Sequence, residues 1–244
     1  YGRALQAPAL ENGMLRMLIP IAAALLALTG ALAAACFVKA FGIAFLGKPR
    51  TRHVAHAREV PIGMLLGMGL LKAGDHLICS RSVFGSTIML FGREFAKFGV
   101  ETSFVSQTDV GEWQRAVRPN TKLLFAESPT NPLTEVCDIA ALSAIARQAG
   151  AWLAVDNCFC SPALQRPIEY GADLIIHSGT KYLDGQGRVI AGAICGAEQL
   201  VEEKFVPVMR SAGMSLSPFN AWVVLKGMET LSIRMQAQSA RALE

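Results

Sequence analysis

The sequence lacks the cysteine and histidine patterns of a metal site or a disulfide framework. Its six cysteines include no Cys-x-x-Cys pair, and its four histidines do not stand beside them. Cys158 and Cys160 are separated by one residue, which is poor spacing for zinc. Most of the cysteines lie in or beside apolar runs, so we interpret them as reduced, mostly buried thiols of a cytoplasmic protein.

Charge is also scarce, and it is unevenly distributed. Charged residues make up 17% of the 244 residues, whereas hydrophobic residues make up 52%. Residues 1–59 hold seven Lys or Arg and two Glu, a net charge of +5, while the remaining residues carry a net charge of −1. The sequence contains no nucleic-acid motif, internal repeat or low-complexity linker. We therefore expect no nucleic-acid partner, and one large domain or two small ones.

One long apolar run is present near the start of the chain. Residues 17–38 contain no charge over 22 positions, which is long enough for a helix that spans a bilayer. Basic residues follow between positions 39 and 58, so the carboxyl end of such a helix is expected to face the cytoplasm. A buried, alanine-rich helix of a soluble protein is the alternative interpretation. The run predicts membrane contact through residues 17–38 and tethering of the chain there.

Within this region, residues 33–50 read AAACFVKAFGIAFLGKPR. This segment resembles a transmembrane helix of the proton-translocating, antiporter-like membrane subunits of hydrogenase-4 and complex-I-type assemblies. The resemblance covers residues 10–70 and implies Lys39 as the candidate for proton transfer. One helix cannot form a proton pathway by itself. A membrane-embedded fragment of such a subunit is nevertheless an alternative function.

After residue 68 the pattern changes to alternating strands and helices. Short apolar segments alternate with amphipathic helical segments, which is typical of a mostly parallel sheet covered by helices. We therefore assign this region to the α/β class. The expected strands are 77–79, 101–105, 122–125, 152–155, 174–176 and 189–193, and the expected helices are 86–98, 110–117, 138–149, 198–209 and 218–243.

Functional side chains follow four of these strands. Phe84, Asn131, Asp156 and Lys181 each come shortly after a predicted strand, and ligands of such sheets lie beyond the carboxyl ends of the strands. Pyridoxal phosphate (PLP) needs a lysine amine, a carboxylate for its ring nitrogen, an aromatic ring against its face and donors for its phosphate. Separately, each residue also has a structural interpretation, as a turn, a cap, a polar loop or core. Together they predict a PLP site.

Five motifs extend this prediction to a family. The region 68–244 resembles the Cys/Met-metabolism family of PLP-dependent enzymes, of the aspartate-aminotransferase fold type (PLP fold type I). Within that family it is most similar to the O-succinylhomoserine sulfhydrylases. The motifs are SRSVFGST (80–87), AESPTNP (126–132), AVDNCF (154–159), HSGTKYLDGQGRV (177–189) and SPFNAWVVLKGMETLSIRM (217–235).

The resemblance implies a role for each candidate residue. Lys181 would form the Schiff base and act as the catalytic residue, and Asp156 would bind the pyridine nitrogen. Phe84 stands where most members have Tyr, so its ring can stack but has no phenol for proton transfer. Proton transfer would then depend on Lys181. The remaining implied contacts are those of Ser178 and Thr180 with the phosphate and of Asn131 with the ring hydroxyl and the substrate carboxylate.

The implied reaction is a γ-replacement on an activated homoserine ester. O-succinylhomoserine and sulfide would give homocysteine and succinate, a step of trans-sulfuration in methionine biosynthesis. Cystathionine γ-synthase and γ-lyase chemistry are the alternatives within the family, and a non-catalytic interaction fragment is an alternative outside it. The expected partners are a small amino-acid substrate and further copies of the chain in a homo-oligomer.

Three features of the family pattern are missing from the sequence. These are a Ser-Gly-Met phosphate loop, an N-terminal Tyr-x-Arg segment and a C-terminal small domain with a carboxylate-binding arginine. We therefore expect a joined, truncated chain. Residues 1–67 would be a segment similar to a membrane subunit, and residues 68–244 would be the cofactor-binding large domain in the cytoplasm. The junction is expected near residues 67–71, and PLP binding is expected to be weak.

Overall fold

The computed structural model describes residues 62–213 and 215–244. They belong to a compact unit that extends from Glu59 to Glu244. Helix α3 (Ile62–Leu70) is part of this unit, and Leu65 and Leu66 are buried in its core. The apolar run 17–38 lies outside the described residues. Within the described part of the chain, no helix combines the length and the apolar character needed to cross a membrane.

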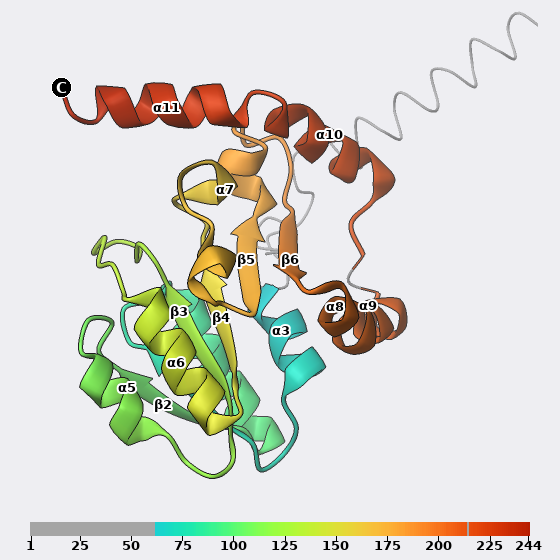
Figure 1. Cartoon of the computed structure of the whole chain (residues 1–244). Coiled ribbons are helices and arrows are strands. Elements are labelled where there is room, and N and C mark those ends of the chain that lie inside the picture. The colour runs from blue at the N-terminus through green and yellow to red at the C-terminus, as the bar shows by residue number, and fades with distance from the viewer. Residues whose placement is uncertain (1–61, 214) are drawn as a thin grey trace, which may run out of the picture. The chain divides into compact units, whose positions relative to one another are not determined.

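A six-stranded sheet forms the centre of the unit (Figure 1). Its order is β2-β1-β3-β4-β5-β6, in which the first five strands are parallel and β6 is antiparallel to β5. The predicted α/β class with a mostly parallel sheet is confirmed. The strands are β1 (His76–Ser80), β2 (Glu101–Val105), β3 (Thr121–Glu127), β4 (Trp152–Asp156), β5 (Leu174–Ser178) and β6 (Gly192–Gly196).

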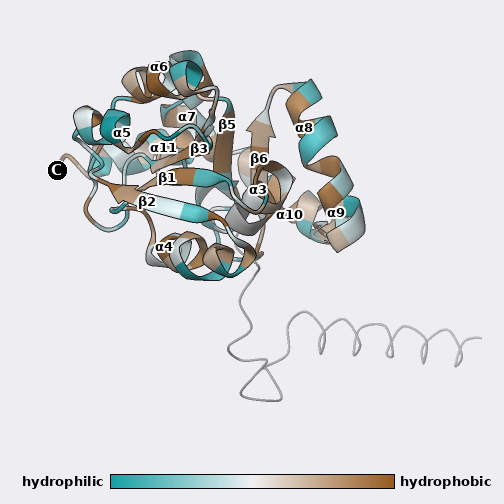
Figure 2. Ribbon diagram, turned by 90° about the horizontal axis from the view of Figure 1, so that it is seen from below, coloured by the Kyte–Doolittle hydropathy of each residue, from teal (hydrophilic) through white to brown (hydrophobic). Residues whose placement is uncertain are grey.

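Helices cover both faces of the sheet. Figure 2 shows α5 and α6 on one face and α4 on the other. In Figure 1, α10 and α11 lie beyond the carboxyl end of β5. The remaining helical elements are α4 (Gly85–Met89), η3 (Leu90–Glu94), η4 (Phe95–Phe98), α5 (Val110–Ala116), α6 (Ile139–Ala149), α7 (Ser161–Leu164), η5 (Pro167–Tyr170), η6 (Gly179–Leu183), α8 (Glu198–Lys204), α9 (Val206–Ala212), α10 (Pro218–Met228) and α11 (Leu231–Arg241).

Alternating side chains of the strands build two cores. Leu77 and Leu123 point to the face covered by α3 and the segment 85–98, whereas Ile78 and Leu124 point to the face covered by α5 and α6. This alternation follows from the two-residue repeat of a strand. Because both faces are covered, the strands are apolar on both sides, as the sequence predicts.

Helix α6 illustrates how local sequence sets the helix ends. The Asp138 side chain accepts a hydrogen bond of 2.9 Å from the Ala141 amide and caps the first turn. Gly150 adopts a φ of 62° and ends the helix in the left-handed conformation that glycine favours. Between them, Leu142 and Ala146 lie four residues apart and are fully buried. The predicted helix 138–149 is thereby confirmed to within one residue.

The last strand begins later than predicted. The expected strand 189–193 is instead β6, Gly192–Gly196. Ala191 donates its amide to Thr180 Oγ1 at 3.0 Å, and its carbonyl accepts from the Thr180 amide at 3.2 Å. The backbone amide and carbonyl of Ala191 therefore bind Thr180, in the turn after β5, and do not pair with β5.

Three predicted helices are divided. The segment 86–98 passes from α4 through the π-helical turn η3 to the 3-10 turn η4, which keeps Phe91 and Phe95 buried. The segment 198–209 breaks at Phe205, because Pro207 has no amide hydrogen and cannot continue α8. The segment 218–243 breaks at residues 229–230, where the helix axis turns between α10 and α11.

Candidate active site

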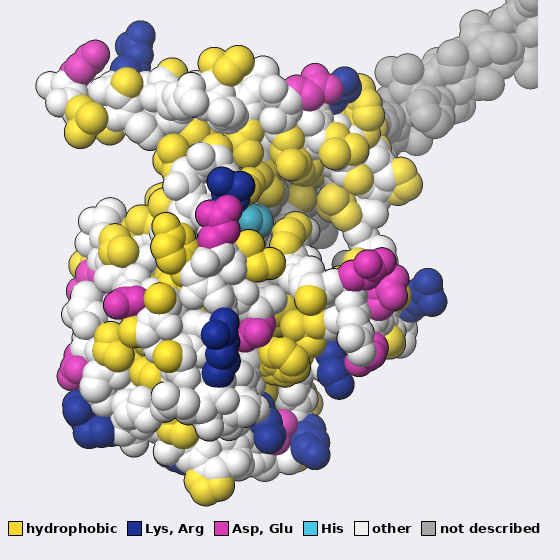
Figure 3. All heavy atoms as spheres, in the orientation of Figure 1, with side chains coloured by type: hydrophobic (Ala, Val, Ile, Leu, Met, Phe, Trp, Pro, Cys, Tyr) yellow, Lys and Arg dark blue, Asp and Glu magenta, His cyan; other side chains and the backbone are white. Residues whose placement is uncertain are grey.

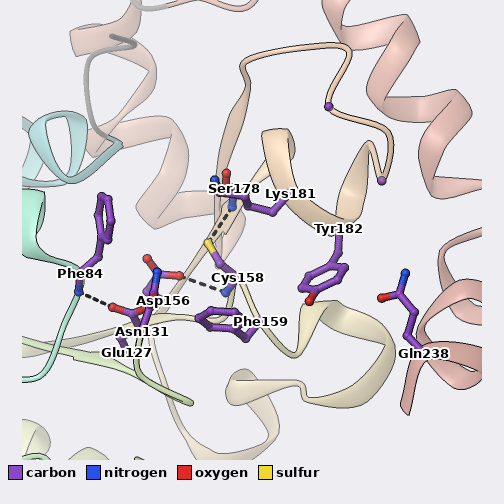
Figure 4. Close-up of a pocket in the computed structure, with 12 residues that line it drawn as sticks. Phe84, Glu127, Asn131, Asp156, Cys158, Phe159, Ser178, Lys181, Tyr182 and Gln238 are labelled. Atoms are coloured by element: carbon purple, nitrogen blue, oxygen red, sulfur yellow. Dashed lines mark hydrogen bonds between the residues drawn. The ribbon is translucent and has the colours of Figure 1, made fainter. Parts of the chain in front are cut away.

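A cavity of about 560 Å³ lies at the carboxyl ends of β1, β3, β4 and β5. Figure 4 shows side chains from each of these strand ends pointing into it. Parallel strands bring their carboxyl ends to one edge, so residues distant in sequence meet there. The lining residues are Phe84, Glu127, Asn131, Asp156, Cys158, Phe159, Ser178, Lys181, Tyr182, Gly185, Gly187 and Gln238.

Phe84 forms one wall of the cavity. Its side chain is large and apolar, yet the residue is 51% exposed. Its backbone amide donates a hydrogen bond of 2.6 Å to Glu127 Oε2 at the end of β3. The structural interpretation of Phe84 as core is therefore wrong, because an apolar ring is left facing open space. A planar ligand would cover that ring.

Two carboxyl groups lie side by side at the floor of the site. Glu127 and Asp156 are register partners at the ends of β3 and β4. Glu127 is 4% exposed, and burial, reinforced by the charge of Asp156, raises the pKa of its carboxyl to about 7. Burial also raises the pKa of Asp156. Among the described residues, neither carboxyl forms an ion pair, so this floor would be stabilised by a bound cation.

Cys158 joins the ends of β4 and β5. Its amide donates to Asp156 Oδ1 at 3.0 Å, and its Sγ accepts from the Ser178 amide at 2.9 Å (Figure 4). Burial and the neighbouring Asp156 carboxylate raise the pKa of the thiol far above its ordinary value. The side chain is therefore a neutral thiol within the wall of the cavity.

Lys181 lies in η6, directly after β5. Its backbone angles, φ −90° and ψ −119°, depart from helical values within this short turn. The residue is exposed, and its side chain lines the cavity on the same side as Ser178 (Figure 4). Gly179 allows the turn to approach Ala191, just before β6, because a Cβ on Gly179 would lie 2.7 Å from Ala191 Cβ. The lysine thus reaches the cavity from a turn packed tightly against the sheet.

The C-terminal helices hold this turn from the other side. Arg234 Nη2 donates to the carbonyl oxygens of Tyr182 and Gly227, each at 2.9 Å. A Cβ on Gly227 would lie 2.4 Å from the Asp184 carbonyl, so α10 contacts the turn backbone directly. Figure 3 shows hydrophobic side chains gathered below the α10–α11 layer on this face. The position of Lys181 therefore depends on residues more than forty positions later in the chain.

The structure brings together most, but not all, of the predicted site residues. Phe84, Asn131, Asp156, Ser178 and Lys181 line the cavity. The sixth predicted residue does not: the hydroxyl of Thr180 is hydrogen-bonded to the backbone of Ala191.

Sequence reasoning missed five other side chains of the lining. Glu127 could have been found from its place in the motif 126–132 at a strand end, and Cys158 and Phe159 from the motif 154–159. No sequence motif indicates Gln238, because it reaches the cavity from α11 and does not follow a strand. The full set of missed residues is Glu127, Cys158, Phe159, Tyr182 and Gln238.

A sheet of this type, with an exposed lysine, a carboxyl floor and an aromatic wall, is characteristic of PLP-dependent enzymes. The profile of the family described as "Cys/Met metabolism PLP-dependent enzyme" matches residues 61–244. The chain belongs to this family, whose cofactor is pyridoxal phosphate. The predicted family, enzyme class and cofactor are confirmed. The match starts at residue 61, and nothing in it supports the resemblance of residues 10–70 to a membrane subunit.

The chain is similar to several other proteins of this kind. It is 55% identical over 190 residues to O-succinylhomoserine sulfhydrylase from Pseudomonas aeruginosa, covering 78% of this chain and 47% of the relative. It is 44% identical over 176 residues to a probable cystathionine gamma-synthase from Herpetosiphon aurantiacus, covering 72% of this chain and 55% of the relative. The chain thus spans about half the length of these relatives.

A solved structure supports the same fold. The crystal structure of metB from Corynebacterium glutamicum is 35% identical in sequence and superposes with a TM-score of 0.68. The superposition covers 70% of this chain and 44% of that one. The predicted PLP fold type I is therefore confirmed for the described region.

The residues present fit the cofactor. The carboxyl of Asp156 has no ion-pair partner in the described part of the chain, and a protonated ring nitrogen would supply one. The exposed ring of Phe84 provides an aromatic surface, and Ser178 and Lys181 provide a hydroxyl and an amine on the same side of the cavity. The individual residue assignments stay predictions.

Proposed function

We propose that the complete protein catalyses γ-replacement on O-succinylhomoserine, with sulfide as the nucleophile and homocysteine and succinate as products. The observation that carries this proposal is the placement of Lys181, Asp156 and Phe84 around one cavity. The choice of substrate rests on the 55% identity to the sulfhydrylase from Pseudomonas aeruginosa and the 44% identity to that from Mycobacterium tuberculosis.

Each residue would make one contribution to cofactor binding. Lys181 would hold the cofactor through its ε-amine, and Asp156 would keep the ring nitrogen protonated. Phe84 would pack against the ring, and Ser178 would donate to the phosphate. Asn131 would bind the ring hydroxyl and the substrate carboxylate. Thr180 has no free donor for the phosphate, because its hydroxyl and its backbone amide are both hydrogen-bonded to Ala191.

The bound cofactor supplies an electron sink that makes the substrate Cα–H bond acidic. Lys181 then accepts the proton from Cα and transfers protons at Cα and Cβ. Phe84 has no hydroxyl, so it contributes no proton. The Cγ–O bond of the substrate breaks and succinate leaves with the bonding electrons. Sulfide forms the new Cγ–S bond, and the protons return to Cβ and Cα to give homocysteine.

Cofactor binding can be tested by adding PLP to the full chain and recording its visible absorbance. Borohydride reduction followed by peptide mass spectrometry should then locate the cofactor on Lys181. Lys181→Ala is expected to abolish both signals, whereas Lys122→Ala, an exposed lysine of β3, should preserve them. A signal that survives Lys181→Ala would contradict the assignment.

The reaction has one close competitor. The relatives include a probable cystathionine gamma-synthase, so cysteine is an alternative nucleophile. The complete protein should be given O-succinylhomoserine with sulfide or with cysteine at equal concentration, and the products separated by mass. Preferential formation of homocysteine supports the proposal, and preferential formation of cystathionine overturns it. Homo-oligomeric assembly and a cytoplasmic location stay predictions.

A further inference from the structure

Cys158 occupies a junction that the proposed mechanism does not use. It lies two residues beyond Asp156, and its side chain fills the space between the ends of β4 and β5 (Figure 4). On one side is the residue proposed to bind the cofactor ring nitrogen. On the other is Ser178, which begins the turn that carries Lys181.

The hydrogen bonds around Cys158 have a defined direction. Sγ accepts the Ser178 amide hydrogen at 2.9 Å. The Cys158 backbone amide supplies a second bond, to Asp156 Oδ1 at 3.0 Å. Cys158 therefore accepts from Ser178 through its sulfur and donates to Asp156 through its backbone amide.

This arrangement opposes a nucleophilic role for the sulfur. Burial and the adjacent carboxylate raise the pKa of the thiol, so it retains its proton. The sulfur lone pair is engaged by the Ser178 amide. The five cysteines of the described region are all free thiols, and none is disulfide-bonded.

We propose that Cys158 is a positioning residue that bridges Asp156 and Ser178, through its backbone amide on one side and its thiol on the other, fixing the ring-binding carboxylate relative to the turn that carries Lys181. The inference rests on the proposed function, because it assigns these two residues to one cofactor. Cys158 is hydrogen-bonded to both of them: its backbone amide donates to Asp156 Oδ1, and its Sγ accepts from the Ser178 amide.

The experiment compares three variants of the full chain. Cys158→Ala removes the acceptor of the Ser178 amide, Cys158→Val removes it while filling the space, and Cys158→Ser retains an acceptor there. Cys160→Ala is the matched control, because this nearby thiol lies outside the cavity lining. Circular dichroism and thermal unfolding verify that each variant folds. If Cys158→Ala does not fold, the comparison of Val with Ser decides the question.

The first measurement needs no cofactor. Hydrogen exchange of the Ser178 amide, followed in the PLP-free chain, should accelerate about tenfold in the Ala and Val variants, because the amide loses its acceptor. It should stay near the wild-type rate in Cys158→Ser and Cys160→Ala. Equal rates in all four proteins would overturn the bridge.

The second measurement is the dissociation constant for PLP, determined by absorbance titration. Loss of the Ser178–sulfur hydrogen bond should loosen the turn that carries Lys181 and weaken binding about fivefold in the Ala and Val variants. Binding within about twofold of wild type would overturn the link to the cofactor. If the wild-type chain shows no Lys181-dependent binding, the proposed function fails, and the exchange rates still decide whether the bridge exists.

Discussion

Glu127 makes the stability of the protein depend on pH in an unusual direction. The residue is 4% exposed at the end of β3, beside Asp156, and burial together with that neighbouring charge raises the pKa of its carboxyl to about 7 from an ordinary value of 4.5. The folded protein therefore binds this proton more tightly than the unfolded chain. Between pH 4.5 and 7 the folded state carries more protons, so the contribution of Glu127 to stability decreases as pH rises.

The magnitude follows from the difference between the two pKa values. Each pKa unit corresponds to about 1.4 kcal/mol, so the full difference is worth about 3 kcal/mol above pH 7. Glu127→Gln removes the titration. It also alters the bond to the Phe84 amide, but that effect is constant with pH. The difference in free energy of unfolding between wild type and Glu127→Gln therefore changes with pH only because the Glu127 carboxyl titrates.

The assay is urea unfolding of the full chain without added PLP, at pH 5 and pH 8. Relative to wild type, Glu127→Gln should gain about 2 to 3 kcal/mol in its free energy of unfolding between these pH values. Glu202→Gln, at an exposed position of α8, is the control and should show little change. If wild type and Glu127→Gln respond equally to pH, the carboxyl is not perturbed and the reasoning is refuted.

Two further predictions concern the turn that follows Lys181. Gly227→Ala places a Cβ 2.4 Å from the Asp184 carbonyl and 2.5 Å from that of Leu183, so it should destabilise the protein by about 2 kcal/mol in urea unfolding despite the better helix propensity of alanine. Gly85→Ala, which meets open space, should have little effect. Asp184 is 1% exposed, and although burial opposes ionisation, hydrogen bonds and charge from Arg188 lower its pKa. Asp184→Asn should lower the free energy of unfolding by about 2 kcal/mol at pH 7. This loss relative to wild type should shrink as pH falls below the ordinary carboxyl range, because Asp184 of the wild type is then protonated too. An equal loss at pH 3 would contradict this.

The sequence alone predicts much of the fold and most of the site. Short strands that are apolar on both sides indicate a covered parallel sheet, and its topology brings the strand ends to one edge. Phe84, Asp156 and Lys181 could therefore be placed together from their positions after strands. The start of α6 was also predictable from the sequence, because the cap at Asp138 depends only on neighbouring residues.

Other features depend on contacts between distant parts of the chain. The hydroxyl of Thr180 was expected at the phosphate, but the backbone of Ala191, eleven residues later, binds it. Because Ala191 makes this contact, β6 begins only at Gly192. The high pKa of Glu127 arises first from its burial and then from the charge of Asp156, which the pairing of β3 and β4 places beside it; no pattern within either strand encodes that pair.

The sequence by itself thus determined which side chains stand at the strand ends, because strand and turn preferences are local. Tertiary structure decided which of those side chains are free to meet a ligand and which are engaged by the protein. Cys158 shows the difference most clearly. In the sequence it is an apolar residue near Asp156, whereas in the fold its thiol accepts from Ser178 and its backbone amide donates to Asp156. Burial and hydrogen-bond geometry, which assign such roles, exist only once the strands are packed.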